Sequence, residues 1–529
     1  MNARHGLHVV LALVIAVLAV AGPEVAPARA AESWPLPDAP LRLVIPDVGA
    51  FDAALGGSFR AALTGTLPES DPAYAAWRQT QVGAKLIAQW QKLEGDLPWT
   101  WSQVVALEAR SLGLALLDVG HLETVVAIST PLAALPSPLA KGQARNHAGV
   151  GYQVVAAGAG DAGPAGAGEG ATDEDGERRM GLAWARVGEW VLIATSERAL
   201  VAALDAQTSG HGFGLPLAGL VSMELDLDRL RKDRYFKREF LFAAGPETGR
   251  MRAALRRDGE RVVEVREGAN DPRKPGYDFD GGGAALAGWE ADGGALWQAL
   301  RSGILEPVPD PAERPRVSLG LLPAATLDKN DDRYLVSFVK PLAKPGAPPT
   351  DEGELAQWRA WLDENPAAGW AYVVDRDGTR RIGVPWPAAR DEELIALCRA
   401  TASRRAGRVE VASVDGAREV RAGADLPMVA IRRVGDLVWI GPSAKALVAA
   451  PAAVRSADRV RWARLDLGVV RGQIPRWERA EGPAAPEQVR ALSDRIAGML
   501  GWIPRVGSAS VERRITASGG WTETVTLTP

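Results

Sequence analysis

Three carboxylates at alternate positions form the pattern in this sequence that comes nearest to a catalytic site. Glu224, Asp226 and Asp228 alternate with apolar residues, so an extended strand would place all three acids on one face. Paired acids serve glycoside hydrolysis or hold a divalent cation. A strand with one solvated face has the same pattern, and a similar strand later in the chain keeps only Asp466. A carboxylate-based polysaccharide hydrolase is therefore the alternative function.

Histidine, the residue most used for proton transfer and metal binding near neutral pH, is scarce. The chain has five, of which two lie at the extreme N-terminus and the others in three separate loop-like contexts: His5, His8, His121, His147 and His211. No H-E-x-x-H pair, G-x-S-x-G elbow, Walker A loop or dinucleotide fingerprint occurs. We predict no catalytic, cofactor-binding or metal-ligating residues and no cofactor, and favour a protein without enzymatic activity.

Two further patterns that resemble functional motifs have structural interpretations. The single cysteine, Cys398, lies in a helical-looking stretch from Asp391 to Thr401, where a small buried side chain is expected rather than a catalytic thiolate. The segment Asp375 to Thr379 resembles part of a calcium loop but lacks the downstream Glu of an EF-hand. Apolar residues on both sides predict that Asp377 and Gly378 form a hairpin turn.

Two features suit binding. The stretch from Arg229 to Glu239 carries six basic residues against two acids, a local charge of +4, and could contact anionic lipid headgroups, lipopolysaccharide or a polyanionic polymer, although a solvated helix face has the same composition. The chain also has 18 Trp. Trp99 and Trp101 alternate as a surface pair might, whereas Trp184, Trp190 and Trp439 occupy strand positions expected in the core.

The N-terminus predicts export. Arg4 is followed by an apolar run from Val9 to Ala21, and Ala28-Arg29-Ala30 offers small residues at cleavage positions. The run has about 13 residues, whereas a membrane-spanning helix needs ~20. We predict a signal peptide of residues 1–30, a mature chain without an integral membrane span, and a periplasmic or extracellular location.

Composition excludes several protein classes. The 529 residues are 47% hydrophobic and 24% charged with a net charge of −4, which indicates a globular chain of two or three domains. The absence of basic excess argues against nucleic acid as a partner. An envelope component is the partner class that an exported protein suggests, and its identity stays open.

The chain resembles itself. Residues 187–203 align without a gap on residues 434–450, with ten of seventeen positions identical. Leu225-Asp226-Leu227 follows the first block at about the distance at which Leu465-Asp466-Leu467 follows the second. The strands predicted at 150–157 and 408–414 also occupy matching positions upstream. We infer a duplicated unit at roughly 40–300 and 310–529.

Each copy predicts a hairpin, a helix and a further strand. Strands 180–186 and 190–194 flank a turn at Val187-Gly188, and strands 428–433 and 437–440 flank one at Val434-Gly435. Ser196 and Ser443 then stand at N-cap positions before Ala/Leu/Val-rich helices. This order favours an α+β fold with two similar units, largely antiparallel sheets and packed helices.

The remaining segments complete the predicted organisation. Helices are expected at 71–95 and 486–499, a closing hairpin at 507–527, a mobile Gly/Ala-rich loop at 158–179 and a Pro-rich linker at 340–349. The predicted domains are the signal peptide, a first unit over 31–305 and a second over 306–529.

The stretch 183–204 contains a strand, a Val-Gly turn, a second strand and a capped Ala/Leu helix. Together with the signal peptide and the repeated unit, this stretch resembles a family of exported bacterial proteins known only as a domain of unknown function. The resemblance implies an envelope protein and transfers no functional residue. The function expected from the sequence is therefore a non-enzymatic binding or scaffolding module in the envelope.

Overall fold

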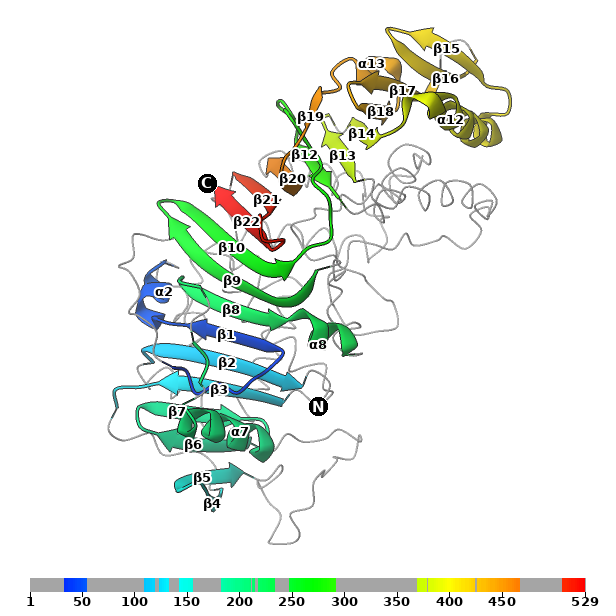
Figure 1. The fold of residues 1–529 in the computed structure, drawn as a ribbon. Coiled ribbons are helices and arrows are strands. Elements are labelled where there is room, and N and C mark those ends of the chain that lie inside the picture. The colour runs from blue at the N-terminus through cyan, green and yellow to red at the C-terminus, as the bar shows by residue number, and fades with distance from the viewer. Residues whose placement is uncertain are drawn as a thin grey trace, which may run out of the picture. The chain divides into compact units, whose positions relative to one another are not determined.

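The computed structural model describes an α+β protein whose strands pair almost throughout in antiparallel ladders (Figure 1). The described residues are 33–54, 109–118, 123–132, 142–155, 182–210, 212–214, 217–233, 247–291, 369–377, 379–423, 426–466 and 507–528. They form two compact units, one ending at Ala269 and one beginning at Asn270. The predicted fold class is confirmed.

The first unit contains a ten-stranded sheet. Its strands, in spatial order, are β4 (Gln143–His147), β5 (Val150–Val155), β6 (Leu182–Val187), β7 (Trp190–Ala194), β3 (Glu123–Ser129), β2 (Ser111–Asp118), β1 (Leu41–Ile45), β8 (Val221–Asp226), β9 (Thr248–Asp258) and β10 (Arg261–Asn270). The first strand of the chain therefore lies inside the sheet, between β2 and β8.

Helices pack on both faces of this sheet because successive strand residues alternate between the faces. Helix α7 (Glu197–Thr208) buries Leu200 and Leu204 against one face, in a cluster with Trp34 and Leu36. Helices α2 (Val48–Ala54) and α8 (Leu227–Lys232) contribute Phe51 and other apolar residues to the opposite face.

The second unit also contains a ten-stranded sheet. In spatial order its strands are β15 (Glu410–Val414), β16 (Ala417–Ala422), β17 (Leu426–Val434), β18 (Leu437–Gly441), β14 (Arg380–Pro385), β13 (Trp370–Val374), β12 (Leu286–Glu290), β20 (Arg459–Asp466), β21 (Ser508–Ile515) and β22 (Trp521–Thr528). The predicted closing hairpin corresponds to β21 and β22.

Two layers cover the second sheet. Helix α12 (Asp391–Ala406), which follows the one-turn helix η3 (Ala388–Arg390), packs on one face with Cys398 fully buried. The four-residue helix α13 (Ala444–Leu447) packs on the other face, beside a small ribbon of β11 (Tyr277–Phe279) and β19 (Ala453–Arg455). Trp439 is completely buried beneath them.

The two sheets have the same strand order and corresponding hairpin registers. Val187 pairs with Trp190 and Ala183 with Ala194, while the aligned residues Val434 and Leu437, and Ala430 and Gly441, pair in the same way. Strand β7 lies between β6 and β3, and β18 between β17 and β14. The strand neighbours of the repeated segment are therefore equivalent.

The residues that follow these strands are also equivalent. The Ser196 hydroxyl accepts a hydrogen bond from the Ala199 backbone at 3.1 Å, and Ser443 accepts one from Ala446 at 3.2 Å. Both serines are the predicted N-caps. Apolar residues at aligned positions are also buried in both units: Val191 and Val438, Ile193 and Ile440, Leu200 and Leu447.

Three details differ from the sequence prediction. The hairpin turns contain Gly188-Glu189 and Gly435-Asp436, one residue later than expected, because positive φ is required at the glycine and the preceding valine completes the strand. The strand predicted to reach Asp228 ends at Asp226, which caps α8.

The third difference concerns the upstream strands. By strand order, β5 matches β16, and the segment at 408–414 contains β15, which matches β4. Both hairpins turn on a residue of positive φ followed by glycine, Ala148-Gly149 and Asp415-Gly416. The sequence comparison paired the wrong members of two similar hairpins.

The signal peptide, the predicted helices at 71–95 and 486–499, the loop at 158–179 and the linker at 340–349 lie outside the described residues. The predicted first unit ends at residue 305, whereas the structure begins the second unit at Asn270, before β11 and β12. Within the described ranges, no helix combines the length and apolar character needed to cross a membrane.

Candidate functional site

The carboxylate of Glu224 lies among arginines from neighbouring strands. On β8, Glu224 is directly opposite Arg42 of β1 on one side and Arg252 of β9 on the other. Arg42 donates a hydrogen bond to Glu224, Arg250 donates another at 3.1 Å, and the Arg252 guanidinium is 3.6 Å away. The registers of three strands thus place three guanidinium groups around one carboxylate.

A second carboxylate, that of Asp38, extends this network. It accepts hydrogen bonds from Arg229 at 2.9 Å and Arg250 at 3.1 Å, and lies 3.8 Å from Arg42. We call this group the arginine cluster; its members are Arg42, Arg229, Arg250, Arg252, Asp38 and Glu224. Four guanidinium groups share these two carboxylates, and Asp226, directly opposite Arg250 on β8, is a third acid beside them.

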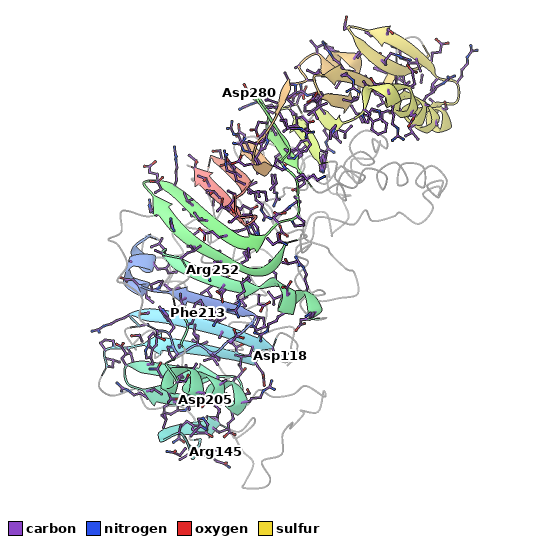
Figure 2. The ribbon with its side chains drawn as sticks, viewed as in Figure 1. Asp118, Arg145, Asp205, Phe213, Arg252 and Asp280 are labelled. Carbon is purple, nitrogen blue, oxygen red and sulfur yellow. The ribbon has the colours of Figure 1, made fainter. Side chains whose placement is uncertain are left out.

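Burial divides the cluster into two parts. The side chains of Arg42 and Glu224 are 10% and 8% exposed, and the Arg42 guanidinium lies 4.4 Å from the centre of the Phe213 ring. Arg229, Arg250 and Arg252 are 41%, 47% and 53% exposed. Figure 2 labels Arg252 and Phe213 on this unit. The inner pair supports the sheet, and the outer arginines present donors to solvent.

The other two acids of the predicted strand face have separate structural roles. Asp226 accepts a hydrogen bond from the Arg229 backbone at 3.0 Å and caps α8. Asp228 belongs to the helix and accepts a hydrogen bond from the Gly249 backbone at 3.0 Å. The expectation that all three acids share one strand face is therefore wrong, because the chain turns into a helix after Asp226.

The predicted basic segment is described from Arg229 to Asp233; residues 234–239 are outside the described part. Within it, Arg229 joins the arginine cluster, and Arg231 lies 3.7 Å from Asp228. The sequence did not predict Arg42, Arg250 and Arg252 as site residues. The one sequence pattern that pointed to any of these residues was the alternation of Arg250 and Arg252 along β9. Their proximity to Arg229 depends on strand pairing, which the sequence pattern does not show.

The remaining predicted sites have structural roles. His147 lies on β4, where its Nε2 is 2.6 Å from Asp205 Oδ1, and His121 and His211 are outside the described residues. Burial raises the pKa of the Cys398 thiol to about 12, as expected for a structural cysteine. Asp375 and Asp377 lie between β13 and β14, and the Asp375 backbone donates to Thr379, which confirms the hairpin.

A contrasting charge network lies in the second unit. Arg513 donates hydrogen bonds to Glu523 at 2.8 Å and to Asp271 at 3.2 Å, and stacks on the Trp521 ring at 4.0 Å. Burial raises the pKa of Asp271, but hydrogen bonds and the charge of Arg273 outweigh this and lower it overall. The carboxylates of this network equal its arginines, so it resembles a structural ion-pair network.

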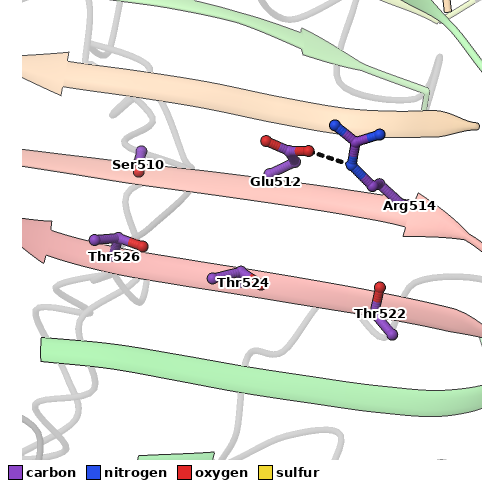
Figure 3. Close-up of a pocket in the computed structure, with 6 residues that line it drawn as sticks. All are labelled: Ser510, Glu512, Arg514, Thr522, Thr524 and Thr526. Atoms are coloured by element: carbon purple, nitrogen blue, oxygen red, sulfur yellow. Dashed lines mark hydrogen bonds and ion pairs between the residues drawn. The ribbon is translucent and has the colours of Figure 1, made fainter. Parts of the chain in front are cut away.

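Two hollows lie on the second unit. Figure 3 shows one, a volume of about 250 Å³ over β21 and β22, lined by hydroxyl and charged side chains: Ser510, Glu512, Arg514, Thr522, Thr524 and Thr526. Arg514 pairs there with Glu512 and, at 3.0 Å, with Asp458. The other hollow, of about 460 Å³, lies beside β13 and β14 and includes Arg381.

Across the residues that the structure describes, no three His, Cys, Asp or Glu side chains converge as a metal site would require. Comparison of the chain with models of known protein families, with curated proteins and with solved structures gives no match.

Proposed function

We propose that this is an exported, non-enzymatic binding protein of the cell envelope, and that its first unit binds an anionic polymer through the arginine cluster. The observation that carries the proposal is that four guanidinium groups gather around two directly paired carboxylates. An acidic chain gains nothing in solubility from gathering at one place arginines that outnumber their carboxylate partners, whereas an anionic ligand would add the missing partners.

The chemistry of arginine favours this function. A guanidinium group presents five donors in a planar fork that matches carboxylate, sulfate and phosphate groups. Arg229, Arg250 and Arg252 stand on a helix and a strand, while the buried Arg42–Glu224 pair fixes the strands beneath them. A rigid row of exposed arginines suits repeated anionic groups along a polymer better than a single small anion.

The two units have the same architecture. Their shared strand order, matching hairpin registers and matching serine caps support descent from one duplicated unit. The arginine cluster belongs to one unit: the register positions of Arg42 and Arg252 are occupied by Ala287 and Ser510 in the other. If the two units diverged after duplication, only the first unit has the arginines needed to bind polyanions.

Dextran sulfate and neutral dextran of equal length provide the test, because they share one backbone and only the first carries anionic sulfate groups. We expect the protein to bind dextran sulfate at 50 mM NaCl and to lose binding above about 0.5 M, where exposed charges are screened. Arg250→Gln with Arg252→Gln should weaken binding at least tenfold. Arg198→Gln with Arg418→Gln removes the same charge from exposed arginines that pair with carboxylates outside the arginine cluster, Glu123 and Glu392, and should bind as the wild type.

Three outcomes contradict the proposal. Equal binding to both polymers would exclude charge recognition, and equal weakening by both variants would show that net charge, rather than the arginine cluster, decides affinity. Binding to phosphatidylglycerol vesicles without binding to dextran sulfate would replace the polymer with a membrane surface. Export is tested separately: mass spectrometry of the native protein should find Ala31 at the N-terminus, and an intact Met1 would contradict it.

A further inference from the structure

The larger hollow of the second unit has the size of a small-molecule site. Its volume is about 460 Å³, within the range of ~300–1,000 Å³ typical of ligand pockets. A loop from Asp280 to Ala284 and a second from Ala449 to Ala452 form its walls, and Val373, Asp375 and Arg381 complete the lining. Figure 2 labels Asp280 at this place.

A shortened helix contributes to this hollow. In the first unit α7 continues to Thr208 and buries Leu204 completely. Extending the sequence alignment by one residue places Pro451 opposite Leu204, and α13 ends at Leu447. Proline lacks the N–H and the space needed inside a helix, so the second unit lacks the helical cover that Leu204 provides in the first.

At two positions where the first unit has buried apolar residues, the second unit has residues of another kind. Leu41 and Leu286 occupy the same register position, so Leu36, five residues earlier, corresponds to Gly281. By the pairing of the next two strands, the fully buried Val125 corresponds to Arg381. The first unit fills these two positions with apolar side chains, whereas the second unit has a glycine loop at one and a guanidinium group at the other.

The buried guanidinium group of Arg381 makes fewer hydrogen bonds than it has donors for. Its side chain is 4% exposed; Nη1 donates to the Ala449 carbonyl at 2.6 Å and Nη2 to Asp375, while Nε has no hydrogen-bond partner among the described residues. A buried arginine in place of valine adds a desolvation cost and unsatisfied donors. The half-buried Asp375 and the exposed Asp280 supply acceptors at the same hollow.

We propose that this hollow binds a neutral, hydroxyl-rich ligand such as a saccharide unit. A hydroxyl group both donates and accepts, so it can satisfy carboxylates, guanidinium and backbone N–H groups together. Arg381 and Asp375 neutralise each other as an ion pair, and Asp280, the other charged residue of the lining, opposes an anion. At Gly282 and Gly283 a Cβ would meet open space, so a ligand can approach the backbone there without a side chain between them.

Ligand-detected NMR with the full chain tests this site, using glucose, N-acetylglucosamine, cellobiose and chitobiose as probes at millimolar concentration. We expect at least one to bind, with an affinity that changes less than twofold between 50 and 500 mM NaCl. Gly283→Leu should abolish binding, because a Cβ at Gly283 meets open space at the hollow and the larger side chain would occupy it. Gly214→Leu, also built into open space but in the first unit, is the control and should bind normally.

Circular dichroism should show both variants folded; if Gly283→Leu is not, Gly283→Val at the same position takes its place. Failure of all four saccharides to bind, or binding unaffected by the variant at position 283, would overturn the proposal. Binding that weakens strongly with salt, or binding of ethanolamine instead, would overturn the neutral-ligand assignment. These outcomes are separate from those for dextran sulfate, because the Arg250 and Arg252 variant should leave saccharide binding unchanged.

Discussion

Replacing Glu224 with glutamine tests how strongly the arginine cluster depends on its buried carboxylate. The substitution preserves side-chain size but removes the charge that faces Arg42, whose side chain is 10% exposed. Losing one partner of a buried ion pair costs ~3–5 kcal/mol. Asp38, 3.8 Å from Arg42, supplies part of the lost attraction. We therefore expect Glu224→Gln to lower the free energy of unfolding by about 2–4 kcal/mol.

Urea unfolding followed by circular dichroism and Trp fluorescence measures this loss, and two further variants identify its cause. Glu392→Gln removes a carboxylate that also pairs with an arginine but is 77% exposed, so it should cost less than about 1 kcal/mol. Arg42→Leu with Glu224→Leu leaves no unpaired inner charge and should recover at least half of the loss. A Glu224→Gln protein as stable as the wild type would refute the claim that Arg42 depends on this carboxylate.

Three further predictions concern packing, capping and thiol chemistry. Leu200→Ala and Leu447→Ala should each lower the unfolding free energy by ~2–5 kcal/mol in urea titrations, because both side chains are fully buried; a loss below about 1 kcal/mol would contradict their core positions. Ser196→Ala and Ser443→Ala should each cost ~0.5–2 kcal/mol in the same assay, since each removes an N-cap hydrogen bond, while Thr at either position should retain most of the stability. Cys398 should not react with a thiol reagent at pH 8 until urea unfolds the protein, because burial raises its pKa to about 12 and the reagent needs an exposed thiolate; rapid modification of the folded chain would be inconsistent with this burial.

Local sequence patterns predicted the parts of the fold that depend on neighbouring residues. The strand and helix after Gly188 and Gly435, the two serine caps and the closing hairpin all follow from turn residues, caps and alternation over a few positions. The end of β8 was missed although Asp226 is a favourable N-cap residue. The regular alternation of acidic and apolar residues continues through Leu227, and this strand pattern was followed instead of the N-cap.

The arginine cluster could not be predicted because its members are distant in the sequence. Arg42 and Glu224 are 182 residues apart, and Asp38 and Arg250 are separated by 212. Only the placement of β1 beside β8, and of β8 beside β9, brings these charges together. The hollow around Arg381 has the same origin, since its walls come from segments that precede β12 and follow α13.

The central position of the first strand constrains how each unit is assembled. Strands β1 and β12 come first in their ten-stranded sheets, yet each pairs on one side with a strand made long afterwards, β8 and β20. Such non-local pairing slows folding because the intervening chain loses entropy before the contacts form. During synthesis each early strand presents an open edge to other chains until its late partner arrives. Assembly of both units is therefore expected to be slow and concentration-sensitive, with aggregation rather than local unfolding as the main route of failure.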